Sequence, residues 1–386
     1  MDFELSWLLL ALPLVFGLGW LASRLDLRQW RIENRRDPKA YFRGLNFLLN
    51  EQQDQAIDAF IEAVQNDPDT SELHFALGNL FRRRGEYERA VRVHEHLLLR
   101  ADLSQADRDR AQHALALDFL KAGLLDRAEA ALRKLDGTAL QTQAQLAMLA
   151  IYERSRDWPH AAEIAQQLET AGQGSFTARQ AHYLCEQAST LMAAGQAQAA
   201  RSLLERAVAT APQAARSHIE LSRWLQQSGD AANAFATLAT LYQQVPQAIS
   251  LVAMDLARLG LGLGLGQAQQ AQRLLGDAYR KAASLDVLDA LVLLQAHEAG
   301  MPSAQDWYLR HLEREPSLVA AAKWLAGEKL EHEQFHPQVQ RALDHAVKPL
   351  TRYRCAACGF EAQQHFWQCP GCQAWDSYPP RRIEEL

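Results

Sequence analysis

The sequence has little cysteine and no excess of basic residues, and both shortages exclude classes of protein. Only 5 of the 386 residues are cysteine, and four of these fall within the last 32 residues. A secreted domain held together by disulfides spreads its cysteines through the fold, so this distribution favours one metal site plus a spare cysteine. The formal net charge is −6 at pH 7, so the chain as a whole has no positive field to hold nucleic acid.

Proline is also scarce, which bears on secondary structure. The chain has 13 prolines, and 48% of its residues are hydrophobic. This composition predicts an ordered and mostly helical protein that is long enough to bury a large core, with disorder confined to short linkers.

A helix–turn–helix unit recurs along the middle of the chain, and residues 71–104 are its clearest copy. Leu77 and Phe81 lie four residues apart and therefore share one face of the first helix. Gly78 beside them leaves room for a second helix to approach. Ala90 is small at the position where the two helix axes would cross most closely, so the unit is predicted to be an antiparallel helical pair.

The register of this unit is Leu-Gly, an aromatic residue three positions on, glycine at the turn, an aromatic residue two later and alanine three later, within a period of 34 residues. This register resembles the tetratricopeptide repeat. Six copies run from residue 37 to 246, and a weaker stretch from about 251 to 343 keeps only helical periodicity, as end repeats often do. In the other copies the frame falls on Gly44, Phe47, Ala56, Phe60 and Ala63; on Leu115, Ala116, Phe119, Gly123 and Ala128; on Met148, Tyr152, Trp158 and Ala161; on Leu191, Gly195, Ala200 and Leu204; and on Leu221, Leu225, Gly229, Ala234 and Leu238.

The resemblance implies a right-handed solenoid whose concave face binds peptides or proteins. In that family the first helix of each pair lines the groove, which in the best copy predicts Glu72, Phe75, Asn79, Arg82 and Arg83 as partner-binding residues. The alternative is that the arginines form a solvated helix end, where cations favour the helix dipole.

The N-terminal segment predicts a membrane anchor. Leu5 to Ala22 carries no charge over 18 residues, about 27 Å as a helix against a hydrocarbon thickness of ~30 Å. A cleaved signal peptide is the alternative, but such a peptide begins with basic residues and this chain begins with Asp2 and Glu4. Basic residues follow the segment instead, which predicts that everything C-terminal to it is cytoplasmic. These residues are Arg24, Arg28, Arg31, Arg35 and Arg36.

Three further motifs receive structural interpretations. Leu259 to Gly266 alternates leucine and glycine but lacks the strand and the last glycine of a phosphate loop, so we expect an elongated turn between helices. His332 to His336 matches the H-E-x-x-H zinc motif, but Pro337 predicts that a helix ends at His336. Cys185, on an apolar helical face, is expected to be a core residue.

The C-terminal cysteines carry the most specific chemical signal. Cys355, Cys358, Cys369 and Cys372 form C-x2-C-x10-C-x2-C, which can supply four thiolates to a tetrahedral metal. The spacing resembles rubredoxin-type knuckles and zinc ribbons, although the two pairs lie closer together than in true rubredoxin and Gln373 stands where glycine is often found. Zinc is therefore favoured over iron, and all four cysteines would be structural.

The same segment is rich in aromatic residues for its size. A module of about 35 residues buries too little surface to fold alone, so the metal would supply much of its folding free energy. We expect some aromatic side chains to pack against the helical array. The aromatic residues are Tyr353, Phe360, Phe366, Trp367, Trp375 and Tyr378.

The order of these parts resembles the lipopolysaccharide assembly protein B family of Gram-negative bacteria over the whole chain. The resemblance rests on the N-terminal anchor, the Tyr-Phe-Arg-Gly-Leu-Asn-Phe-Leu-Leu-Asn start, the Leu-Gly-Asn-Leu-Phe-Arg segment and the terminal Tyr-Arg-Cys-x-x-Cys-Gly-Phe with Trp-x-Cys-Pro-x-Cys. It implies a non-enzymatic inner-membrane adaptor that helps the membrane-bound protease FtsH degrade the deacetylase committing precursor to lipid A. Other lipopolysaccharide assembly proteins are further implied partners. The family's metal site carries over to the four C-terminal cysteines, whereas contacts of the middle repeats do not.

These observations predict an all-α chain with four parts. They are a transmembrane anchor (1–23), a basic linker (24–36), a tetratricopeptide-repeat array (37–347) and a rubredoxin-like or zinc-ribbon β module (348–386). Three alternative functions stay open. They are a scaffold for another envelope complex, an electron-transfer protein with redox-active iron, and a metalloprotease using His332 and His336.

Overall fold

The computed structural model describes residues 15–17, 19–20, 39–66, 70–328 and 336–386. Most of the expected anchor and the whole basic linker lie outside these residues. Within the part of the chain that is described, no helix is both long enough and apolar enough to cross a membrane. The chain divides between Ser155 and Arg156 into two compact units.

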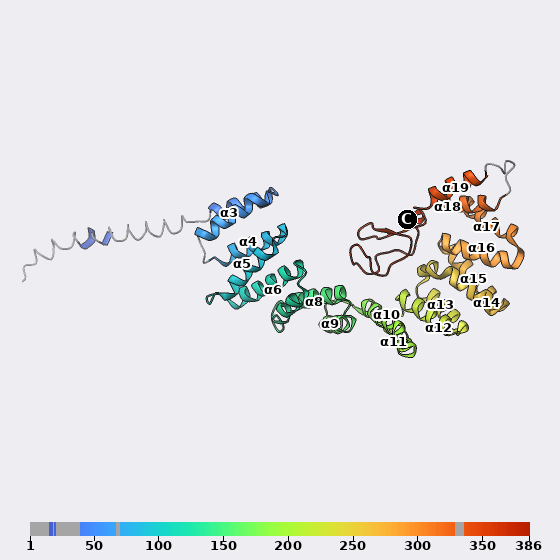
Figure 1. Cartoon of the computed structure of the whole chain (residues 1–386), viewed down its shortest axis with the longest axis horizontal. Helices are drawn as coiled ribbons and strands as arrows, with labels where there is room; N and C mark the ends of the chain where they lie inside the picture. The colour runs from blue at the N-terminus through green and yellow to red at the C-terminus, as the bar shows by residue number, and fades with distance from the viewer. Residues whose placement is uncertain (1–14, 18, 21–38, 67–69, 329–335) are drawn as a thin grey trace, which may run out of the picture. The chain divides into compact units, whose positions relative to one another are not determined.

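Unit 1 is a series of helices joined by short turns (Figure 1). Its core includes Ile57, Phe60, Leu77 and Phe81, which pack together from successive helices. Its helices are α2 (Lys39–Leu49), α3 (Gln53–Asn66), α4 (Ser71–Arg84), α5 (Tyr87–Leu99), α6 (Gln105–Lys121), α7 (Leu125–Arg133) and α8 (Gln141–Ser155).

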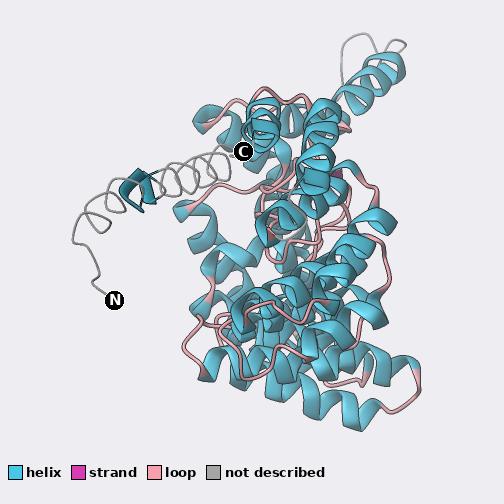
Figure 2. Cartoon of the chain, turned by 90° about the vertical axis from the view of Figure 1, so that its left-hand side faces the viewer, coloured by secondary structure: helices cyan, strands magenta, loops and turns pink. Residues whose placement is uncertain are grey.

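Unit 2 continues the helical series and ends in a small module that is mostly loop (Figures 1 and 2). The module contains β1 (Tyr353–Arg354), antiparallel to β2 (Glu361–Ala362), and the 3-10 turn η3 (Ile383–Glu385). The helices are α9 (Trp158–Thr170), α10 (Thr177–Ala193), α11 (Ala197–Thr210), α12 (Ala215–Gln227), α13 (Ala231–Gln244), the 3-10 helix η1 (Pro246–Val252), α14 (Ala253–Leu263), α15 (Leu265–Lys281), α16 (Leu285–Ala299), α17 (Met301–Arg314), α18 (Leu318–Gly327) and α19 (His336–Val347).

The repeat register explains the turns and the closest helix crossings. At Gly85 φ is 85°, and its N–H is bonded to the Arg82 carbonyl, which closes the end of α4. Side chains other than glycine rarely adopt this conformation. The alanine expected at each crossing is fully buried. The alanines with 0% exposure include Ala56, Ala90, Ala128, Ala161, Ala200 and Ala234.

Two local expectations were wrong. The Leu-Gly stretch is not an elongated turn, because α14 continues to Leu263 and Gly264 alone, with φ 114°, connects it to α15. Gly260 allows this close approach, since a Cβ atom there would lie 3.0 Å from the backbone oxygen of Gln267. In addition, no helix ends at His336. The residue begins α19, with Pro337 in the first turn, where proline's missing N–H is not needed.

Candidate metal centre

Two similar backbone turns hold the four cysteines of the module. In the first, the Gly359 N–H donates to the Cys355 carbonyl at 2.9 Å, and in the second the Gln373 N–H donates to the Cys369 carbonyl at 2.9 Å. Both donor residues have positive φ, 78° at Gly359 and 62° at Gln373. Gly359 adopts this left-handed conformation without strain because it has no side chain, and Gln373 adopts it despite its side chain.

The four sulfur atoms converge on one point. Cys355 Sγ lies 3.8 Å from Cys372 Sγ, and Cys358 Sγ lies 3.7 Å from Cys369 Sγ. All four lie within 4.8 Å of one another. Sulfur atoms placed tetrahedrally at 2.3 Å from a metal ion are about 3.8 Å apart, so the residues fit a tetrahedral ion. Such an ion has no coordination position left for a substrate.

Burial and hydrogen bonding shift the pKa values of these thiols in opposite directions. Burial raises the pKa of Cys355, but hydrogen bonds with the Ser377 side chain and with two backbone amides outweigh it and lower that pKa to about 6. Burial likewise raises the pKa of Cys369, but hydrogen bonds from backbone amides outweigh it, so the pKa is lowered. A backbone bond at Phe360 lowers the pKa of Cys358, but burial and the neighbouring sulfurs raise it to about 12. Cys358 would therefore release a proton on metal binding.

The module packs on the helical part of unit 2, as the excess of aromatic residues predicted. The Trp375 ring stacks on the His182 ring of α10, with centroids 4.7 Å apart and planes at 22°. The His182 Nε2–H donates to both carboxylate oxygens of Asp376, at 3.0 and 2.9 Å. Trp158 of α9 meets the Trp375 ring edge-on at 6.2 Å. The His182 side chain is 2% exposed and that of Asp376 is 52% exposed, so only the histidine side of this contact is withdrawn from water.

Sequence reasoning did not find His182, Asp376 or Trp158 as members of this interface. His182 and Asp376 are 194 positions apart, and nothing in the repeat register distinguishes the histidine from a core residue. A cavity of ≈ 580 Å³ remains beside the interface, with both apolar and polar walls. Its lining includes Ala178, Pro212, Leu251, Trp367, Asp376 and Tyr378.

Three of the predicted partner-binding residues make contacts inside unit 1. Arg82 Nη1 lies 2.8 Å from Asp118 Oδ1, and Asp118 is completely buried. Asn79 Oδ1 accepts a hydrogen bond from Arg82 Nη2 at 2.5 Å. The Phe75 side chain is 1% exposed.

The other two predicted residues lie nearer the surface. Glu72 is ion-paired with Arg110 at 2.5 Å, and both side chains are about half exposed. Arg83 is exposed. All five residues lie on α4, but their surroundings range from the buried core to the surface. Their role in binding a partner stays a prediction.

Known protein families match two segments of the chain, and known proteins match nearly its whole length. A family model described as a rubredoxin metal binding domain matches residues 353–379, and one described as a tetratricopeptide repeat matches residues 43–94 and 185–249. The lipopolysaccharide assembly protein B of Escherichia coli K12 is 32% identical over 98% of each chain. The protein of that name from Haemophilus influenzae Rd is 27% identical, again over 98% of each chain. The chain belongs to the lipopolysaccharide assembly protein B family.

Proposed function

We propose that this chain is a non-enzymatic adaptor in the inner membrane that restrains lipopolysaccharide synthesis. In this role it brings the deacetylase that commits precursor to lipid A to the membrane-bound protease FtsH, which degrades it. The observation that carries the proposal is the similarity to lipopolysaccharide assembly protein B over 98% of the chain, together with the matches to the repeats and the metal module.

The arrangement of unit 2 supports a binding role for the repeats. Tetratricopeptide repeats present extended surfaces to protein partners, because each repeat contacts only its neighbours and leaves one face open. The module covers part of that array through Trp375 and His182. A repeat surface with a module held on it can position two partners without performing any chemistry.

The four thiolates would have a structural role in this proposal. A bound zinc ion supplies folding free energy to the module and stays closed to substrate, because four protein ligands fill a tetrahedral site. Cys355 and Cys369 anchor the site from the buried side, at 1% and 0% exposure. Zinc rather than iron is proposed because a structural site needs no change of redox state.

The apolar segment Leu5 to Ala22 is proposed to anchor the chain, with both units in the cytoplasm. Deleting residues 1–23 should release the protein from membranes in a high-salt wash. A deleted form that stays with the membrane fraction would show that the repeats themselves bind there. A reporter fused after Leu386 should be active only in the cytoplasm, and periplasmic activity would contradict the orientation.

Depletion of the chain tests the adaptor role. The half-life of the deacetylase should lengthen severalfold after depletion and return to normal when the wild-type chain is restored. The matched control is a cytoplasmic substrate of the same protease, whose half-life should not change. An unchanged deacetylase half-life would overturn the proposal and favour a scaffold for another envelope-assembly complex, which could include other lipopolysaccharide assembly proteins.

A further inference from the structure

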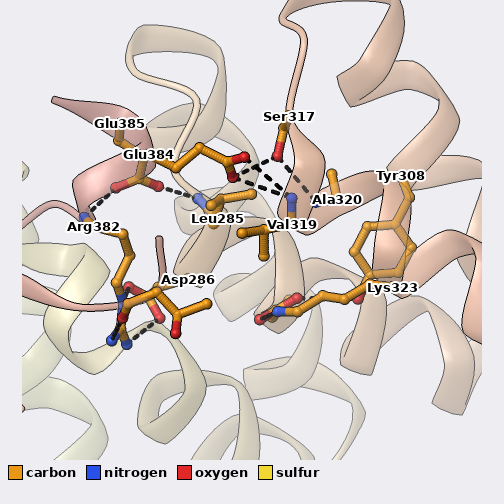
Figure 3. A network of polar contacts seen from close by, with 12 residues as sticks. Leu285, Asp286, Tyr308, Ser317, Val319, Ala320, Lys323, Arg382, Glu384 and Glu385 are labelled. Atoms are coloured by element: carbon orange, nitrogen blue, oxygen red, sulfur yellow. Dashed lines mark hydrogen bonds and ion pairs between the residues drawn. The ribbon is translucent and has the colours of Figure 1, made fainter. Parts of the chain in front are cut away.

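The last five residues, Arg382 to Leu386, fold back on the helical part of unit 2 (Figure 3). The backbone N–H of Ile383 donates to the Arg352 carbonyl at 2.8 Å. Three side chains of this segment, which we call the C-terminal tail, then reach α16 and α18. These two helices are separate elements of the array, so the tail links them.

Glu384 accepts hydrogen bonds from the free backbone amides at the N-terminal end of α18. Its carboxylate accepts hydrogen bonds from the Leu318 N–H at 2.6 Å and from the Val319 N–H at 3.2 Å. The Ser317 hydroxyl donates to the same carboxylate at 2.8 Å and accepts from the Ala320 N–H at 3.0 Å. The first amides of a helix have no partner within it and attract negative charge, so a carboxylate is the group that fits here.

Glu385 does the same for α16. Its Oε1 atom accepts from the Leu285 N–H at 2.5 Å, and its Oε2 atom accepts from the N–H of Arg382 at 2.8 Å. The residue is partly buried, and this burial raises the pKa of Glu385. The two adjacent glutamates therefore contact the N-terminal ends of two different helices.

Arg382 supplies the opposite charge. Its Nε and Nη2 atoms donate to the two carboxylate oxygens of Asp286 at 2.9 and 2.8 Å. Its Nη1 atom donates to the Thr351 carbonyl at 2.7 Å, and its guanidinium lies 4.1 Å from the centre of the Tyr353 ring. Arg382 thus contacts both α16 and the first strand of the metal module.

We propose that the N-terminal ends of α16 and α18, together with Asp286, form a recognition surface for an acidic peptide of the pattern Arg-X-Glu-Glu, and that the tail is its resident ligand. The charges of the tail and the surface are opposite at each contact. The carboxylates of Glu384 and Glu385 lie at the positive ends of two helices, and the guanidinium of Arg382 pairs with the Asp286 carboxylate. An acidic peptide supplied by another chain competes for the same amides and releases the tail. This inference is independent of the proposed role in lipopolysaccharide synthesis.

Binding in trans tests the proposal. The receptor is the chain truncated after Arg381 and purified in detergent. The probe is a fluorescently labelled peptide of residues 380–386, Pro-Arg-Arg-Ile-Glu-Glu-Leu. We expect saturable binding by fluorescence polarisation that weakens about tenfold or more when both peptide glutamates become glutamine, because the charge-assisted bonds are lost. Asp286→Asn in the receptor should weaken it similarly. The undeleted chain should bind the peptide at least about tenfold more weakly, because its own tail fills the surface.

Equal binding of the glutamate and glutamine peptides, or equal binding by the deleted and undeleted chains, would overturn the proposal. If the deleted chain does not fold, the full-length Glu384→Gln/Glu385→Gln variant replaces it. Hydrogen exchange at the amides of Leu285, Leu318 and Val319 should then become about tenfold faster or more. Glu313→Gln, at an exposed position on α17, is the matched control and should leave these amides unchanged. Unchanged exchange in the double variant would refute the tail contacts.

Discussion

Replacing Gly78 by alanine should destabilise unit 1, because the added methyl group would occupy space filled by a buried ring. A Cβ atom at Gly78 would lie 2.5 Å from Nε2 and 2.6 Å from Cε1 of His94. The ring cannot easily move away. It is completely buried, and its Nδ1 atom lies 2.5 Å from the Asp118 carboxylate, which is also held by Arg82.

The expected cost follows from these contacts. Overpacking a core costs about 1–3 kcal/mol, and displacing His94 from the buried carboxylate costs about 1.5–3 kcal/mol more. The better helix propensity of alanine offsets about 1 kcal/mol. We therefore expect the free energy of unfolding of unit 1 to fall by about 1.5–5 kcal/mol, which lowers its melting temperature by roughly 3–20 °C.

Circular dichroism melting of four variants, which are Gly78→Ala, Gly276→Ala, His94→Ala and the double variant Gly78→Ala/His94→Ala, separates the causes. Gly276→Ala is the matched control, because a Cβ atom at this helical glycine meets no atom within 4 Å, and it should stabilise unit 2 by about 0.5–1 kcal/mol. In a His94→Ala background the second change, Gly78→Ala, should no longer destabilise. If Gly78→Ala costs the same with and without the His94 ring, the ring is not the obstacle and the reasoning fails.

Replacing Cys355 and Cys358 by serine should abolish metal binding and unfold the module while the helical circular dichroism persists, because thiolates stabilise the module and neighbouring repeats stabilise one another; retained metal by elemental analysis would refute this assignment. Arg82→Ala should destabilise unit 1 by about 3 kcal/mol, because it leaves a buried carboxylate without its cation. The exposed neighbouring change, Arg83→Ala, should alter the melting temperature little and instead weaken partner capture if the groove is functional. Burial lowers the pKa of His365 below 6.5, so as the pH falls the unfolded module takes up a proton that the folded module excludes. The free energy of unfolding of the module should therefore be full above about pH 6.5 and fall below it. In a His365→Phe variant this fall should be smaller. A denaturant titration at pH 7.5 and pH 5.5 measures that difference, and equal pH dependence of the two proteins would exclude His365 as its source.

The repeat architecture and the clustering of the four cysteines were predictable from sequence because both depend on short-range patterns. Glycine at a turn such as Gly85 and alanine at a crossing such as Ala90 are set by the geometry of one helical pair. The four cysteines are likewise set by two turns of a few residues each. Their sulfur atoms converge as a tetrahedral ion requires, and metal binding by them stays a prediction.

The failures arise where distant segments decide local structure. The Leu-Gly stretch remains helical through Leu263 because Gly260 packs against the backbone of α15, and no local signal reports that contact. The stacking of Trp375 on His182 and the capping of Leu285 by Glu385 join residues far apart in the chain. Composition predicts only that the aromatic rings need a surface, and it does not identify the surface.

Reconstituted proteolysis measures the proposed adaptor role with purified components. The deacetylase is incubated with the purified protease in liposomes and ATP, with and without the full-length chain, and its disappearance is followed with time. We expect severalfold faster degradation with the wild-type chain and no acceleration with the Cys355→Ser/Cys358→Ser variant, whose module lacks two of the four thiols of the metal site. Degradation at the same rate with and without the wild-type chain would contradict the proposed adaptor role.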